Sequence, residues 1–128
     1  MSTSLPRKLE WLRPYLELSR PLLPRGKKIV RVGAWTKGNR YGSDCHASIH
    51  TDDQKNYRIW INLFHWTGGR IPFSRIELIG LLAHELAHTV DMYHSPKHKK
   101  LEAKLLITFM TRLRQEGYVN EEEELNTK

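Results

Sequence analysis

The spacing of apolar residues predicts a helix near the amino-terminal end of the chain. Leucines recur every three or four positions from Leu5 to Leu16, as on the buried face of a helix. Pro14 lies inside this pattern and is expected to kink the helix. The following segment SRPLLPRGKK, residues 19–28, combines two prolines with a glycine and indicates a break in regular structure. We therefore expect residues 1–26 to form a helix and a linker.

Three short stretches after this linker have the alternation and the β-branched content of strands. They are Lys28–Trp35, Cys45–His50 and Tyr57–Phe64, and the last of them, YRIWINLF, has the strongest pattern. The residues TDDQKN, which separate the second stretch from the third, are typical of a hairpin turn. We expect the three stretches to form a small antiparallel sheet.

A second helix is predicted to begin at Ser74 and to be apolar on nearly every side. Ser74 and Glu77 have the spacing of a capping box. Phe73 and Leu78 have the spacing of a hydrophobic staple. Leucine and isoleucine occupy half of the positions from 75 to 86, namely Ile76, Leu78, Ile79, Leu81, Leu82 and Leu86. Because such a helix has no broad polar face, it should be buried.

A third helix is predicted to begin at Ser95-Pro96, where a cap residue precedes a proline at the first helical position. Gly117 is expected to end it. The helix carries Leu101, Leu105, Phe109 and Leu113 on one apolar stripe. The order helix, small sheet, helix, helix predicts an α+β fold in which residues 1–128 form a single domain.

The composition is that of an ordinary globular protein. The chain has 128 residues, of which 39% are hydrophobic and 27% are charged, enough for one domain with a real core. No apolar run approaches the roughly 18 residues that a membrane span requires, and the first residues lack the pattern of a signal peptide. Cys45 has no second cysteine with which to form an internal disulfide. We expect a cytoplasmic monomer without membrane association, whose acidic residues 119–128 form a flexible tail.

The positive charge of the chain leaves two interpretations open. The formal net charge is +7, and the basic residues are concentrated in residues 20–40 and 97–104. Such a charge can indicate weak association with nucleic acid, or it can serve solubility alone. Charge by itself does not decide between them.

The predicted apolar helix carries the spacing H-E-x-x-H at His84, Glu85 and His88, which is typical of zinc hydrolases. Four helical residues turn about 400°, so the two imidazoles lie about 40° apart on one face and can bind one Zn²⁺. Glu85, about 100° away, can take a proton from a metal-activated water and give it to a leaving amine. Since a buried apolar helix should exclude such groups unless they are satisfied, a metal site is favoured.

A catalytic zinc site of this kind needs a third protein ligand. His94 follows His88 by six residues, which in a continuous helix would turn it away from the metal. It can bind only if the helix ends first, and the β-branched residues and the new helix cap that follow favour such a break. We therefore prefer His94 as the third ligand, with Asp91, His98 and Glu102 as alternatives in that order.

The stretch HELAHTVDMYHSPKH, residues 84–98, resembles the pattern H-E-x-x-H-x5-H-S-P-x-F of the SprT-like, WLM and YgjP-like zinc metallopeptidases. RYGSDCH, residues 40–46, is similar to the R-W-G-S-C-S stretch of that group with one residue inserted. IWIN, residues 59–62, is similar to the I-x-L-N strand that precedes its active-site helix. The resemblance covers roughly residues 40–106, and His98 stands where the group usually has phenylalanine.

The resemblance implies that His84, His88 and His94 bind zinc and that Glu85 is the catalytic base. It also implies a minimal zincin-like fold, with an edge strand beside the site that can hold an extended peptide. The expected function is therefore that of a zinc metallopeptidase, which hydrolyses peptide bonds of a protein or peptide substrate with a metal-activated water. Tyr93 or His98 is a candidate for stabilising the oxyanion.

Two alternatives to the peptidase remain open at this point. The first is a DNA-associated zinc-binding protein with little or no protease activity, since SprT-like relatives act on proteins attached to DNA. The second is a zinc hydrolase of a non-peptide amide, which would use the same chemistry on a different bond.

Overall fold

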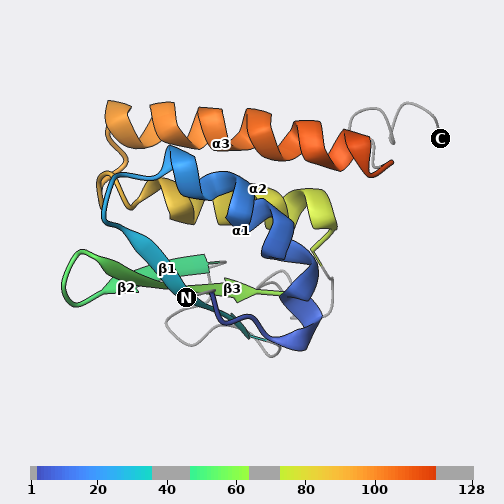
Figure 1. Ribbon diagram of the computed structural model, residues 1–128, viewed down its shortest axis with the longest axis horizontal. Helices are drawn as coiled ribbons and strands as arrows, with labels where there is room; N and C mark the ends of the chain where they lie inside the picture. Colours follow the sequence, from blue (N-terminus) through green and yellow to red (C-terminus); the bar gives the residue numbers. More distant parts are fainter. Residues whose placement is uncertain (1–2, 36–46, 64–72, 118–128) are drawn as a thin grey trace.

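The computed structural model describes residues 3–35, 47–63 and 73–117. Their regular elements, in chain order (Figure 1), are the 3₁₀ helix η1 (Arg7–Leu12), α1 (Arg13–Ser19), the 3₁₀ helix η2 (Arg20–Leu22), β1 (Lys28–Trp35), β2 (Ala47–Thr51), β3 (Asn56–Asn62), α2 (Arg75–Ala87) and α3 (Pro96–Gln115). The expected α+β class is confirmed. The sequence motifs at residues 40–46 and the acidic tail at 119–128 lie outside the described residues.

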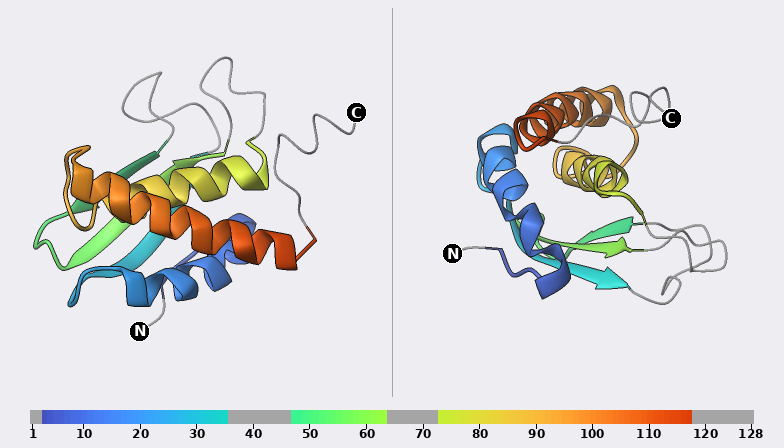
Figure 2. Two further views of the ribbon diagram at one scale, coloured as in Figure 1. Left: turned by 90° about the horizontal axis from the view of Figure 1, so that it is seen from above. Right: turned by 90° about the vertical axis from the view of Figure 1, so that its right-hand side faces the viewer.

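The elements are stacked as layers on one face of the sheet. Figure 2 shows α2 between the sheet and α3, with α1 beside this stack. Accordingly, α2 contacts β2, β3 and α3, whereas α1 contacts α3. The buried apolar side chains of these elements form one continuous cluster. The helix with the H-E-x-x-H spacing is thus the central layer, as its apolar sequence predicted.

The sheet is mixed, so the expectation of a wholly antiparallel sheet is wrong for one of its two pairs. Its strand order is β1-β3-β2, with β2 antiparallel to β3 and β1 parallel to β3. The first pair in the parallel register joins Lys28 to Asn56 and the last joins Trp35 to Asn62. Apolar and polar residues alternate in the same way in both kinds of pairing, so the sequence pattern does not set the direction of β1.

The hairpin between β2 and β3 is confirmed, and Asp53 organises its turn. The Asp53 carboxylate accepts hydrogen bonds from the backbone N–H groups of Lys55 and Asn56, each at 2.9 Å. These bonds hold the pKa of Asp53 well below its ordinary value. Gln54 adopts a positive φ of 58° within the same turn. The turn residues therefore fix the register in which β2 meets β3.

Both predicted helix starts are confirmed. At the start of α2, the Ser74 hydroxyl accepts from the Glu77 N–H while the Glu77 carboxylate accepts from the Ser74 N–H, which makes a full capping box. At the start of α3, the Ser95 hydroxyl accepts from the His98 N–H. Gly117, with a φ of +93°, follows the end of α3 as predicted. These local signals place the two helices that carry the candidate site.

The amino-terminal helix differs from the expectation at Pro14. The segment is not one kinked helix: a 3₁₀ helix runs to Leu12, and α1 begins at Arg13 with Pro14 in its first turn. A proline is tolerated there because the first helical turn does not use its N–H groups for internal hydrogen bonds. Leu9, Leu12 and Leu16 are buried, as their spacing predicted.

The amino-terminal helix is attached to α3 through aromatic packing. The rings of Tyr15 and Phe109 meet edge to face with their centroids 5.6 Å apart. The Tyr15 hydroxyl donates to the Glu116 carboxylate, and burial together with this contact raises the pKa of Tyr15.

In the part of the chain that the structure describes, no helix combines the length and the hydrophobicity that crossing a bilayer requires.

Candidate metal centre

The residues of the candidate site come from the last turn of α2, the connection that follows it and the first turns of α3. The helix α2 ends at Ala87, and α3 begins at Pro96, so the expected break is confirmed. Backbone bonds from the N–H groups of His88, Thr89 and Val90 to carbonyls three residues earlier tighten the chain at this end. The Thr89 hydroxyl adds a bond of 2.7 Å to the Leu86 carbonyl oxygen. The chain therefore turns back toward α2 immediately after His88.

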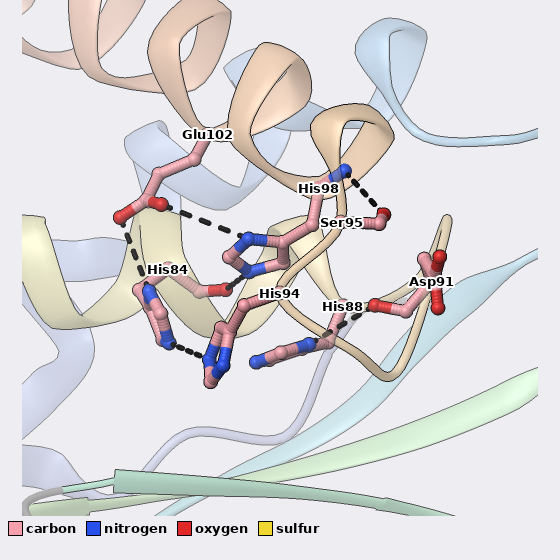
Figure 3. Close-up of polar contacts among 7 residues, drawn as sticks. All are labelled: His84, His88, Asp91, His94, Ser95, His98 and Glu102. Atoms are coloured by element: carbon pink, nitrogen blue, oxygen red, sulfur yellow. Dashed lines mark hydrogen bonds and ion pairs between the residues drawn. The ribbon is translucent and has the colours of Figure 1, made fainter.

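This turn brings four imidazoles together. His84, His88, His94 and His98 each offer one ring nitrogen, and these four atoms all lie within 4.8 Å of one another. The Nε2 atoms of His84 and His94 are 3.0 Å apart (Figure 3). Two neutral imidazole nitrogens that face each other at this distance repel unless one carries a proton or both bind the same cation. The donor set therefore fits a metal ion, and imidazole nitrogens are ligands that Zn²⁺ takes readily.

Two of the rings are oriented by hydrogen bonds on their outer nitrogens. His88 Nδ1 donates to the carbonyl oxygen of Asp91 at 3.0 Å, and His84 Nδ1 lies 3.2 Å from Oε2 of Glu102. Each contact directs the remaining nitrogen, Nε2, toward the centre of the cluster (Figure 3). Burial also lowers the pKa of His88, which favours the neutral ring that a metal requires.

His98 differs from the other three rings because both of its nitrogens face protein groups. Its Nε2 donates to the carbonyl oxygen of His84 at 3.0 Å, and its Nδ1 lies 3.8 Å from Oε1 of Glu102. Its ring lies against that of His88, with centroids 4.1 Å apart, and is only 1% exposed. A ring so enclosed cannot reach a substrate carbonyl, which disfavours an oxyanion role for His98.

The two acidic alternatives to His94 lie outside the group of four imidazoles. The carboxylate of Asp91 turns into the connection, where it accepts a bond of 3.0 Å from the Tyr93 N–H. This bond holds the pKa of Asp91 below its ordinary value. The carboxylate of Glu102 contacts the outer nitrogen of His84 rather than the centre (Figure 3). His94 itself is exposed and faces His84 across the open side of the cluster.

Glu85 directly follows His84 in α2 and is buried. The residue is only 6% exposed. Burial raises the pKa of the Glu85 carboxyl to about 7, and the negative charge of Glu102 adds a smaller effect in the same direction. A carboxyl group with such a pKa exchanges a proton readily near neutral pH, which is the property of a general acid or base. Tyr93, the other candidate for oxyanion stabilisation, is 80% exposed in the same connection, and its role remains a prediction.

The contact between Glu102 and His84 is one that sequence reasoning missed. The sequence suggests Glu102 only as the last of the alternative ligands, whereas it supports a histidine on the neighbouring helix. A signal for it is present, because His98 and Glu102 are four residues apart and therefore share one face of α3. Another missed contact joins Lys27 Nζ to the carbonyl oxygen of Thr89 at 2.8 Å, which attaches the residue before β1 to the end of α2.

Comparison with known proteins gives a likeness of fold. No protein-family model and no curated protein matches the chain. The crystal structure of Wss1 from Saccharomyces cerevisiae is similar, with a TM-score of 0.57 and 15% identity over 92% of this chain and 93% of that one. The crystal structure of a Wss1 mutant from the same organism has the same TM-score, 0.57, with 14% identity over 93% of this chain and 95% of that one. Across nearly its whole length, the chain is therefore similar to Wss1 in fold.

Proposed function

We propose that the protein is a zinc-dependent peptidase. The observation that carries this proposal is the convergence of the imidazoles of His84, His88 and His94, together with the burial of Glu85, which directly follows His84. The fold shared with Wss1 and the resemblance of residues 84–98 to the zinc metallopeptidases support the same conclusion.

In this proposal, His84, His88 and His94 hold the ion and Glu85 handles the proton. A bound Zn²⁺ would polarise the scissile carbonyl and lower the pKa of a water molecule. Glu85 follows His84 directly in the last turn of α2, so its carboxylate flanks the position to which the imidazoles are directed. From there it can accept a proton from the attacking water and deliver it to the leaving amine. His88, fixed by the Asp91 carbonyl oxygen, keeps its free nitrogen available for the ion.

A peptide is the substrate that the surroundings of the site favour. Within the described residues, β2 is an outer strand of the sheet and pairs with β3 on one side. The same strand contacts α2, the helix that carries the candidate catalytic residues. An extended peptide can add to such an edge through backbone hydrogen bonds, which present each peptide bond in a regular way. This edge therefore favours a peptide over a small amide.

Replacing His84, His88 or His94 by alanine is expected to abolish both stoichiometric zinc binding and the cleavage of an unstructured protein such as casein. Two imidazoles alone do not complete a catalytic zinc site. Zinc content after dialysis and the rate of cleavage should be measured on the same samples. A chelator should stop cleavage by the wild type, and excess zinc should restore it.

The matched control is Asp91→Asn, which keeps the bond to the Tyr93 N–H but removes the carboxylate charge. This variant is expected to retain zinc, since the His88 ring is held by a backbone oxygen. A wild-type protein that takes up no zinc would contradict the proposed function. A variant without His94 that binds zinc normally would remove His94 from the ligand set.

A second candidate function, association with nucleic acid, is favoured by a lysine stripe on α3. Lys97, Lys100 and Lys104 are exposed, and their spacing places them within about 60° of one another around the helix. If they contact phosphates, changing all three to glutamine should reduce the slope of log affinity against log salt by up to about 3. Binding of a short DNA duplex should be measured from low to moderate salt.

The control for this experiment removes the same charge elsewhere, at three exposed lysines away from the stripe: Lys8, Lys28 and Lys55. An equal loss of affinity in both triple variants would indicate attraction by net charge alone. Absence of binding at low salt would exclude this candidate function.

A further inference from the structure

The carboxylate of Glu102 occupies a position between two histidines of the cluster. Its Oε2 lies 3.2 Å from Nδ1 of His84, and its Oε1 lies 3.8 Å from Nδ1 of His98 (Figure 3). It reaches these rings from α3, whereas His84 belongs to α2. Its side chain is 25% exposed, so it is partly screened from solvent. A single carboxylate thus connects the two helices at the back of the candidate metal site.

The contact determines which nitrogen of His84 is free. A carboxylate can only accept a hydrogen bond unless it is protonated, so the proton of the neutral His84 ring resides on Nδ1. Nε2 then carries the lone pair, and this is the atom that faces Nε2 of His94. The negative charge beside Nδ1 also makes the opposite nitrogen a better electron donor. Both effects act on metal affinity through His84, without Glu102 touching the ion.

His98 lies beside this carboxylate and bonds the backbone of His84. Its Nε2 donates to the backbone carbonyl of His84, which fixes the spacing of the two helices at this level. Its Nδ1 is buried and has no hydrogen-bond partner among the described residues, and Glu102 is the carboxylate that faces it. A phenylalanine at position 98 could fill the space but could not donate to the His84 carbonyl.

We propose that Glu102 is a positioning residue of the metal centre, which fixes His84 in the Nδ1-protonated tautomer and thereby strengthens metal binding. This proposal rests on the proposed function, since it assigns Glu102 a role toward the ion that His84 would hold. The supporting carboxylate comes from α3, one helical turn beyond a fourth histidine.

The proposal predicts that Glu102→Ala binds zinc about 10-fold to 100-fold more weakly than the wild type. Glu102→Gln should lose less, because its amide oxygen still accepts from His84 Nδ1 although it carries no charge. Affinities should be measured by competition with a chromogenic chelator. The imidazole ¹⁵N and ¹H resonances should show Nδ1-protonated His84 in the wild type and in Glu102→Gln, and a mixture of tautomers in Glu102→Ala.

The control is Glu17→Gln, which removes one carboxylate from α1, where Glu17 pairs with Arg20 at the surface. It is expected to bind zinc as the wild type does. Helical circular dichroism of the metal-free variants checks folding, and the nearly isosteric Glu102→Gln gives a result if Glu102→Ala does not fold.

Two results would overturn the proposal while leaving the peptidase function intact. One is a zinc affinity of Glu102→Ala within twofold of that of the wild type, and the other is an unchanged His84 tautomer in that variant. A wild-type protein without zinc affinity would instead remove the proposed function and the role toward the ion with it. The tautomer of His84 in the metal-free protein would still report on the contact itself.

Discussion

Glu85→Gln is expected to bind zinc within a few-fold of the wild type and to cleave an unstructured protein about 10²-fold to 10⁴-fold more slowly. Glutamine has nearly the same size and shape as glutamate, so the buried end of α2 should pack as before. Its amide cannot accept a proton from the attacking water or return one to the leaving amine. The variant therefore separates proton transfer from metal binding.

The measurement requires zinc content and cleavage rate on the same preparation. Glu17→Gln serves as the control for loss of one carboxylate, because Glu17 is exposed on α1 and pairs with Arg20. It should cleave at the wild-type rate. Wild-type activity in Glu85→Gln would exclude Glu85 as the catalytic base, and a loss of zinc in that variant would show that its effect is structural.

Phe109→Ala is expected to lower the free energy of unfolding by about 3–5 kcal/mol. The Phe109 side chain is completely buried in the middle of α3 and packs edge to face against Tyr15 of α1. Alanine would leave a cavity between the two helices that their backbones cannot close. Urea denaturation followed by circular dichroism would measure the loss, since a chain of this size is expected to unfold in one transition.

Ile107→Ala is the matched control for this core substitution. Ile107 lies two positions earlier on the same helix but is 71% exposed, so its truncation should change stability by less than about 0.5 kcal/mol. Similar losses for the two variants would contradict the packing of α3 against α1.

The features that the sequence predicted correctly are those that depend on near neighbours in the chain. The capping box at Ser74 and Glu77 and the cap at Ser95 place the starts of α2 and α3, because their hydrogen bonds span three residues. The turn around Asp53 is local in the same way. The convergence of His84 and His88 follows from helical geometry alone.

The features that it did not predict depend on how distant elements meet. The direction of β1 relative to β3 is set by tertiary packing. The alternation of apolar and polar residues is the same in parallel and antiparallel strands, so it does not predict that direction. The position of Pro14 at the start of α1, rather than inside a longer helix, depends on a preceding 3₁₀ turn that leucine spacing does not distinguish. The contact of Glu102 with His84 requires that α3 lie against α2 in one particular register.

The four converging imidazoles depend on the pairing of α2 with α3 rather than on the sheet. Every polar contact among the four imidazoles and Glu102 closes a segment of at most 18 residues, so little chain entropy is lost in forming it. The opposite side of α2 contacts β2 and β3 instead (Figure 2). A molecule whose sheet has opened while α2 and α3 remain paired would therefore keep the four imidazoles together, so the proposed metal centre should outlast the sheet during partial unfolding.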